Sequence, residues 1–339
     1  MTEWALPFML ENRSRESENR VRNKLIVAVL SAAVLLFQLG CAVQPEPEEQ
    51  MSSEELDAYY SDLASELLER GYLKSEKSAR EVPFTAEALA MNFEQIALHD
   101  EYVAVDGEFV QKKVPARMRR WDMPIEMQLH FGPNVPEQQR VADRKAVSEF
   151  AARLQDITGH PITWTRSNGN FHILVMNADD RKNIGPLVNE ISPMVDSSIE
   201  RAITHSPKHI LCAAYTSYNR SDFTYENVIV LIKAEHAGIS RLSCIHEEMA
   251  QAMGLVNDSK DARPSIFNDD EEFALLTPHD ELLLKILYDP RLTAGMSIRQ
   301  ARPIAQQIAK ELVAQESLPQ RPSDGRQRPR LTAQSTAPL

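Results

Sequence analysis

The stretch CIHEEMAQAMGLVND, residues 244–258, decides how the rest of the chain is interpreted, because its polar residues recur at helical spacing. A helix that binds zinc through two histidines needs the second histidine four residues after the first. Four residues after His246 stands Ala250, so this frame supplies a single histidine ligand. The motif must therefore be tested in a second frame and against simpler structural roles.

The stretch predicts an amphipathic helix from Ser240 to residue 253. Its apolar stripe consists of Leu242, Ile245, Met249 and Ala252. Glu247 and Gln251 fall on the opposite side of the helix, and His246 and Glu248 fall on its two flanks. Three interpretations stay open, namely a solvated helix face, a buried polar network, and a metal or hydrolytic site. The network would lock the helix to the loop at 257–270 through His246, Glu247, Glu248, Gln251, Asn257 and Asp258.

A frame shifted by one residue is similar to HExxHxxGxxH, the motif of the metzincin zinc proteases. Glu247, Glu248, Gln251, Gly254 and Asn257 occupy its five defined positions. Glu248 would then be the general base, while oxygen ligands replace all three histidines. Amide oxygens suit hard ions such as calcium better than zinc. We therefore predict no resident cofactor, with zinc or calcium at this cluster as the alternative.

Three further segments carry the resemblance. The segment PIEMQLHF at 124–131 resembles the first strand of matrixin-type metzincins, and LTPHDELLLKILYDP at 276–290 resembles their final helix. The segment PSIFND takes the place of their Met-turn, with Phe267 where methionine is expected. The whole of 86–296 also resembles a family of uncharacterised proteobacterial lipoproteins, the domain of unknown function numbered 2927. This resemblance implies a fold and brings no established activity.

The expected fold is α/β (α+β), a metzincin-like twisted mixed sheet packed with helices. Period-2 or continuous apolar patterns predict strands at 125–131, 162–165, 171–176, 209–215 and 228–235. Helical spacing and capping residues predict helices at 52–72, 84–98, 136–157, 240–253, 277–289 and 298–315. The segment RSNGN at 166–170 is typical of a hairpin turn, which would make 162–165 and 171–176 neighbours.

Two cysteines beyond residue 41 are expected to form one disulfide. Cys212 lies in a predicted strand and Cys244 at the start of the motif helix. In an exported protein such an even pair indicates a disulfide, whereas in a cytosolic protein it would indicate two buried thiols. The bond would tie the motif helix to the sheet.

The N-terminal residues predict export. Residues 1–40 are interpreted as a signal peptide with an apolar run at 25–37 and a possible true start near Val21. Cys41 resembles the lipidated cysteine of bacterial lipoproteins, and 41–51 forms a Pro/Glu tether. The expected location is the outer membrane, facing the periplasm. Because Gln38 stands where leucine is usual, an inner-membrane anchor or a soluble periplasmic protein is the alternative.

The remaining organisation is an N-terminal helical segment at 52–85, the metzincin-like domain at 86–296, a C-terminal helix at 297–315 and a disordered tail at 316–339. A net charge of −12 disfavours binding to nucleic acid, which needs clustered basic residues.

The predicted function is a non-hydrolytic envelope lipoprotein that binds a peptide or an envelope protein partner, with strand addition along 171–176 as one route. The alternatives are a metal-dependent peptidase that uses Glu248 and a purely structural envelope domain.

Overall fold

The computed structural model describes residues 2–5, 51–75, 79–80, 82–105, 108–193, 197–268 and 271–316. The predicted apolar run at 25–37, Cys41, most of the tether and nearly all of the C-terminal tail lie outside the described residues. Across the described residues, none of the helices combines the length and the apolar composition that a bilayer crossing requires.

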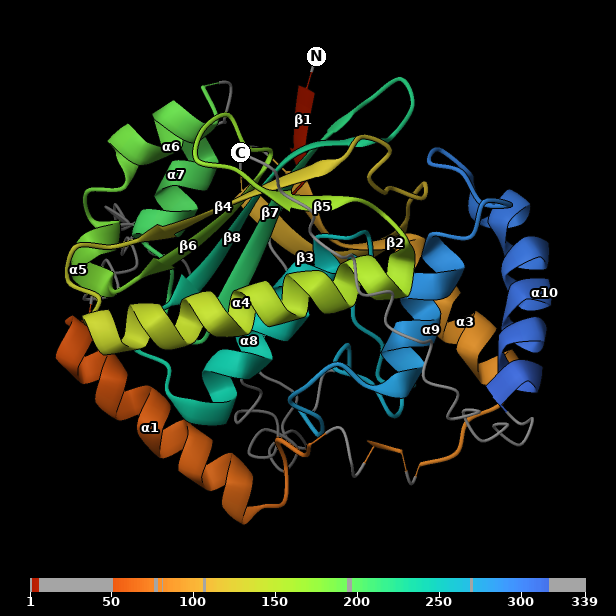
Figure 1. Cartoon of the computed structure of the whole chain (residues 1–339), viewed down its shortest axis with the longest axis horizontal. Coiled ribbons are helices and arrows are strands. Elements are labelled where there is room, and N and C mark those ends of the chain that lie inside the picture. The colour runs from red at the N-terminus through yellow and green to blue at the C-terminus, as the bar shows by residue number, and fades with distance from the viewer. Residues whose placement is uncertain are drawn as a thin grey trace, which may run out of the picture.

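A mixed sheet forms the centre of the molecule, as the sequence predicts (Figure 1). Its strand order is β1 (Thr2–Ala5), β7 (Cys212–Asn219), β8 (Tyr225–Lys233), β6 (Phe171–Met176), β4 (Ile125–Phe131) and β5 (Ile162–Trp164). Strands β5, β4, β6 and β8 run parallel, and β7 pairs antiparallel with β8 and with β1.

The prediction that 162–165 and 171–176 form a hairpin around 166–170 is wrong. Strand β5 pairs with one edge of β4, through Ile125 and Ile162, and β6 pairs with the other edge, through Met127 and Phe171. Local turn propensity cannot report that a third strand separates the two. Strand β6 is buried along its whole length between β4 and β8. Strand addition along 171–176 is therefore excluded, because both of its edges are already paired.

Helices cover both faces of the sheet. Their bounds are α1 Ser53–Glu69, α3 Ala86–Ala97, α4 Glu137–Thr158, α5 Ala178–Arg181, α6 Gly185–Ile191, α7 Ser197–Thr204, α8 Gly238–Gln251, α9 Pro278–Leu287 and α10 Ile298–Glu316. Figure 1 shows α4 and α8 in front of the sheet and α6 and α7 on its other side. A separate two-stranded sheet joins β2 (His99–Val105) and β3 (Glu108–Pro115), which the sequence analysis did not anticipate.

The helix starts follow the predicted capping chemistry. Ser52 and Glu55 form a capping box at the start of α1, and Thr85 caps α3. Thr277 caps α9, whose first residue is Pro278. Each cap satisfies backbone N–H groups that have no partner within the helix.

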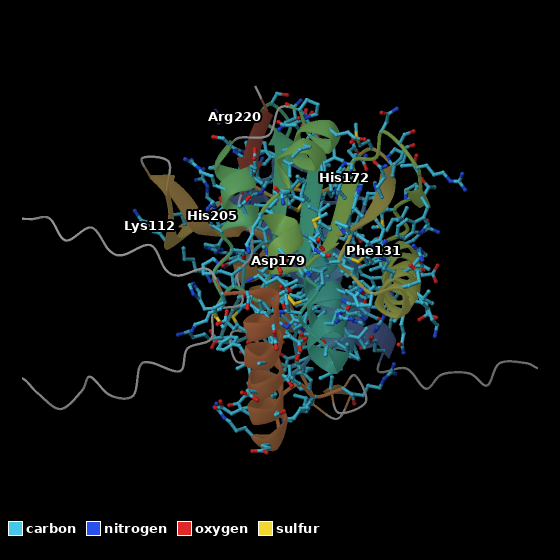
Figure 2. All side chains as sticks on the ribbon, turned by 90° about the vertical axis from the view of Figure 1, so that its left-hand side faces the viewer. Lys112, Phe131, His172, Asp179, His205 and Arg220 are labelled. Carbon is cyan, nitrogen blue, oxygen red and sulfur yellow. A yellow bond between two sulfur atoms is a disulfide. The ribbon has the colours of Figure 1, made fainter. Side chains whose placement is uncertain are left out.

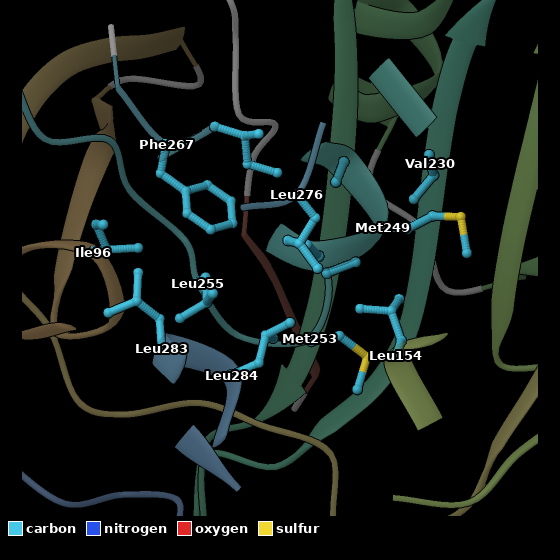
Figure 3. Packing of buried hydrophobic residues seen from close by; sticks show 14 of the residues in the cluster. Ile96, Leu154, Val230, Met249, Met253, Leu255, Phe267, Leu276, Leu283 and Leu284 are labelled. Carbon is cyan, nitrogen blue, oxygen red and sulfur yellow. The ribbon is translucent and has the colours of Figure 1, made fainter. Parts of the chain in front are cut away.

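The larger hydrophobic core lies between the sheet and the helices α3, α4, α8, α9 and α10. Figure 3 shows Met249 beside Val230, and Met253 between Leu154 and Leu284, in this core. A smaller core on the other face packs α6 and α7 against β6, β7 and β8. The motif helix α8 thus belongs to the main core.

Candidate functional site

The motif helix α8 is buried from Ser243 to Gln251, with His246 half-buried, whereas its first turn is partly exposed. It packs against α4, β7 and β8. Glu247 is 2% exposed, Glu248 is 0% exposed and Gln251 is 1% exposed. The interpretation as a solvated helix face is therefore wrong, because a helical wheel gives the direction of a side chain and not what covers it. The polar residues of the motif are buried within the core.

The C-terminal end of α8 is held by two aromatic donors. The Trp121 indole Nε1 donates to the Ala252 carbonyl oxygen at 2.9 Å, and the Tyr288 hydroxyl donates to the Met253 carbonyl oxygen at 3.0 Å. Gly254 follows with φ +126°, and an added Cβ atom there would collide with the Arg119 carbonyl oxygen. Glycine is thus required at position 254 for both backbone conformation and space.

His246 has a structural role. Its Nδ1 accepts a hydrogen bond from the Leu276 backbone N–H at 3.1 Å. Its ring stacks on that of Phe150, with ring centroids 4.0 Å apart. Burial lowers the pKa of His246 to about 3, with the positive charge of Arg153 as a lesser cause. The ring is therefore neutral near pH 7 and anchors the segment before α9 to α8.

The other predicted site residues face different neighbours. Gln251 Nε2 donates to Glu247 Oε1 at 3.4 Å, one helical turn away. Asn257 Nδ2 donates to the Gln95 carbonyl oxygen in α3 at 2.7 Å. Glu248 lies within electrostatic range of Tyr215, a residue of β7. Burial, and secondarily the charge of Glu248, raise the pKa of that phenol.

Asp258 is half-buried just after Asn257. Gln251 thus bonds to Glu247 within α8, His246 joins α8 to the segment before α9, and Asn257 joins the loop after α8 to α3.

Asp280, in the first turn of α9, is the centre of a polar network that the sequence analysis did not assign to the site. Its side chain is 0% exposed. It accepts hydrogen bonds from Ser265 Oγ at 2.5 Å, Ile266 N at 3.1 Å, Thr277 N at 2.9 Å and Thr277 Oγ1 at 2.8 Å. The available signal was the sequence TPHD, since a capping box places its carboxylate three residues after the threonine.

We call the hydrogen bonds of His246, Asn257 and Asp280 the polar brace, because they join α8, α3, α9 and the loop between α8 and α9. His246 joins α8 to Leu276, just before α9, and not to the loop at 257–270. A buried network through all six motif residues stays a prediction. A metal site needs several converging ligands. In the part of the chain that the structure describes, no group of three or more His, Cys, Asp or Glu side chains could hold a metal ion.

One comparison with known proteins gives a match, and it covers α3 to most of α10. The family described as a protein of unknown function, DUF2927, matches residues 86–307. The chain belongs to this family. No curated protein and no solved structure matches it. The matched residues include the strands β4, β5, β6, β7 and β8 and all of the polar brace. The helix α1 precedes them and lies outside the match.

Within the DUF2927 domain, Cys212 of β7 and Cys244 of α8 form a disulfide, with their Cα atoms 5.7 Å apart. The predicted pairing is confirmed. Both cysteines are buried. The bond fixes the motif helix directly to the sheet, in addition to the contacts of the brace.

We expect Gln251→Ala to lower the free energy of unfolding by about 1–3 kcal/mol, because it removes a buried hydrogen-bonding group and leaves Glu247 with fewer partners. The matched control is Gln307→Ala. Gln307 makes the same bond to a glutamate one turn away, Glu311, at 2.8 Å, but on the exposed face of α10. That change should stay within about 0.5 kcal/mol. Urea unfolding of both variants measures the difference, and equal small effects would contradict a structural role.

Proposed function

We propose that the chain is a cell-envelope lipoprotein whose DUF2927 domain binds a peptide or a protein partner without hydrolysing it. Residues 1–40 direct export, and their removal takes β1 from the edge of the sheet, so that β7 becomes the edge strand of the mature protein. Cys41 carries the lipid, and 41–51 connects the domain to the outer membrane on its periplasmic side. The Cys212–Cys244 disulfide supports this location, because disulfides persist in oxidising compartments and are rare in the cytosol.

The observation that carries the non-hydrolytic assignment is the burial of Glu248. A catalytic zinc site keeps an open position for water, and a general base must reach the proton that it removes. Glu248 is 0% exposed inside the main core. Glu247 and Gln251, which occupy two of the three ligand positions in the metzincin frame, are equally enclosed.

The likeness to metzincins is part of this proposal. Phe267, at the position of the methionine in their Met-turn, is fully buried and packs in the same core as Met249 and Leu255 (Figure 3). The order of β4, α8, the turn at 264–268 and α9 also follows the metzincin order. We infer a domain that keeps such a framework while its motif helix has become a brace.

A hydrolysis assay tests the catalytic part of the proposal. The full chain is incubated with an unfolded protein substrate, with and without added zinc, beside the variant Glu248→Gln. We expect no cleavage by either protein. Cleavage that requires Glu248 would replace the proposal with the metal-dependent peptidase alternative.

Fractionation of the producing cell tests the anchor. The full chain should partition with the outer membrane and incorporate labelled lipid, whereas Cys41→Ser should appear in the soluble periplasmic fraction without the label. A Cys41→Ser protein that stays wholly in the membrane fraction would contradict the lipid anchor.

A further inference from the structure

The helix α1 precedes the DUF2927 domain in the chain and covers one end of its sheet. It lies across the carboxyl ends of the parallel strands β6 and β8, beside α5 (Figure 1). Figure 2 shows Asp179 of α5 directly above one end of this helix. In α/β sheets, ligands bind at the carboxyl ends of parallel strands. In this chain that place is taken by a segment from outside the family match.

The first turn of α1 contacts a buried carboxylate. Glu235 Oε1 accepts hydrogen bonds from Ser53 Oγ at 3.0 Å and from the Ala178 backbone N–H at 2.5 Å. Glu235 Oε2 lies 3.6 Å from Arg181 Nη1, and both side chains are buried. The carboxylate therefore lies at the N-termini of two helices, where negative charge is favoured.

The second turn of α1 contacts a buried lysine and a buried histidine. Lys233 Nζ donates to the Tyr60 hydroxyl at 3.1 Å, and that hydroxyl donates to the Lys208 carbonyl oxygen at 3.1 Å. The His236 ring stacks on Tyr60 with centroids 4.0 Å apart. Burial lowers the pKa of Lys233 and brings the pKa of His236 to about 3. We call Arg181, Lys233, Glu235 and His236 the seat of α1.

Two features favour the release of α1. Only Leu56 and Tyr60 of this helix are buried, whereas α8 buries eight side chains. In addition, Arg181 Nε and Nη1 and His236 Nδ1 are enclosed and make no hydrogen bond to any residue that the structure describes. Buried polar groups without hydrogen bonds are unfavourable, so exposing them to water or to another ligand lowers the cost of releasing the helix.

The connection after α1 is suited to a hinge. Gly71 has φ +79°, and an added Cβ atom would meet nothing within 4 Å. The chain is fixed again immediately afterwards, because Leu73 N donates to the Glu271 carbonyl oxygen at 3.0 Å and Lys74 Nζ lies 2.6 Å from Glu272 Oε1. A hinge at residues 70–72 would let the helix move while Leu73 and Lys74 stay on the domain.

We propose that the seat is a helix-binding site and that α1 is its resident occupant, displaced when a partner presents an amphipathic helix. The anchors on α1 are a hydroxyl, an aliphatic side chain and a tyrosine, at Ser53, Leu56 and Tyr60. This spacing of i, i+3 and i+7 is typical of helices that bind in grooves. The inference rests on the proposed partner-binding function and names the surface and the class of partner.

Hydrogen exchange on the full chain tests the release of α1. The double change Ser53→Ala and Tyr60→Phe removes the polar anchors, and the control Ser61→Ala with Tyr59→Phe removes one serine and one tyrosine hydroxyl at the two positions that flank Tyr60. Amides of 57–69 should exchange at least tenfold faster in the first variant, with α4 and α8 unchanged. Unaltered exchange in α1, or an equal acceleration throughout the domain, would overturn the proposal.

A synthetic peptide of residues 51–72 tests the seat in trans. It should bind the Ser53→Ala, Tyr60→Phe protein at least tenfold more tightly than the wild-type protein, since the tethered helix competes at an effective concentration of about millimolar. A peptide that carries the same two changes should not bind. Failure of the unaltered peptide on a variant whose α1 exchanges rapidly would overturn the helix-binding site. The hydrolysis assay and the fractionation, which test the catalytic and the anchoring parts of the proposed function, would be unaffected by that result.

Discussion

Replacing Asp280 with alanine is expected to lower the free energy of unfolding by about 4 kcal/mol, because three donors in the core lose their acceptor at once, whereas the Thr277 hydroxyl keeps the Pro264 carbonyl oxygen as an acceptor. These donors belong to Ser265, Ile266 and Thr277, and they connect the loop after α8 to the first turn of α9. Water cannot readily replace a carboxylate that is fully buried. Chemical denaturation of the purified variant measures the loss.

Asp222→Ala is the matched control for this change. Asp222 accepts hydrogen bonds from the Thr224 backbone N–H at 3.0 Å and from the Thr224 hydroxyl at 2.7 Å, but it is exposed in the turn between β7 and β8. Its removal should cost no more than about 1 kcal/mol, because water satisfies the released donors. An Asp280→Ala protein as stable as Asp222→Ala would show that the loop is held by other contacts.

Removing the disulfide is expected to have the second large effect. Changing Cys212 and Cys244 together to alanine should lower the free energy of unfolding by about 3–4 kcal/mol, since the bond closes a loop of 32 residues. In the chain-entropy model the loss arises mainly from the greater freedom of the unfolded chain. Denaturation of protein recovered from the periplasm, compared with the double variant, gives the value.

The change Cys41→Ser is the control, because it removes the other cysteine of the chain without opening the loop. Its free energy of unfolding should equal that of the wild type. Two free thiols at 212 and 244 in periplasmic protein, or a loss below about 1 kcal/mol in the double variant, would contradict a structural disulfide.

Local patterns predicted most of the fold. The alternation of apolar and polar residues at 125–131 predicted β4, and the Thr-Pro sequence at 277–278 predicted the start of α9. Both predictions depend only on residues that are close together in the sequence. The predicted pairing of 162–165 with 171–176 was wrong, because the turn sequence between two strands does not show that a third strand, β4, lies between them in the sheet. The β2–β3 pair was missed although Asp106 and Gly107 form a dipeptide typical of tight hairpins.

The candidate site was only partly predictable. Helical spacing placed Glu247 and Gln251 on one side of α8, and the structure joins them. A helical wheel could not show that this side would be buried. The sequence KAEH, directly after the apolar run at 228–232, contains three of the four residues that form the seat of α1. Their role could not be predicted from this segment, because their partner α1 lies far away in the sequence.

We propose that the stretch at 244–258 is a structural brace rather than a metal site. Elemental analysis of the full chain, purified without chelator, tests it most directly. We predict that zinc and calcium are far below one atom per chain, and that Glu247→Ala lowers stability without changing the metal content. One zinc per wild-type chain that is lost in Glu247→Ala would contradict the claim and support a metal-dependent peptidase.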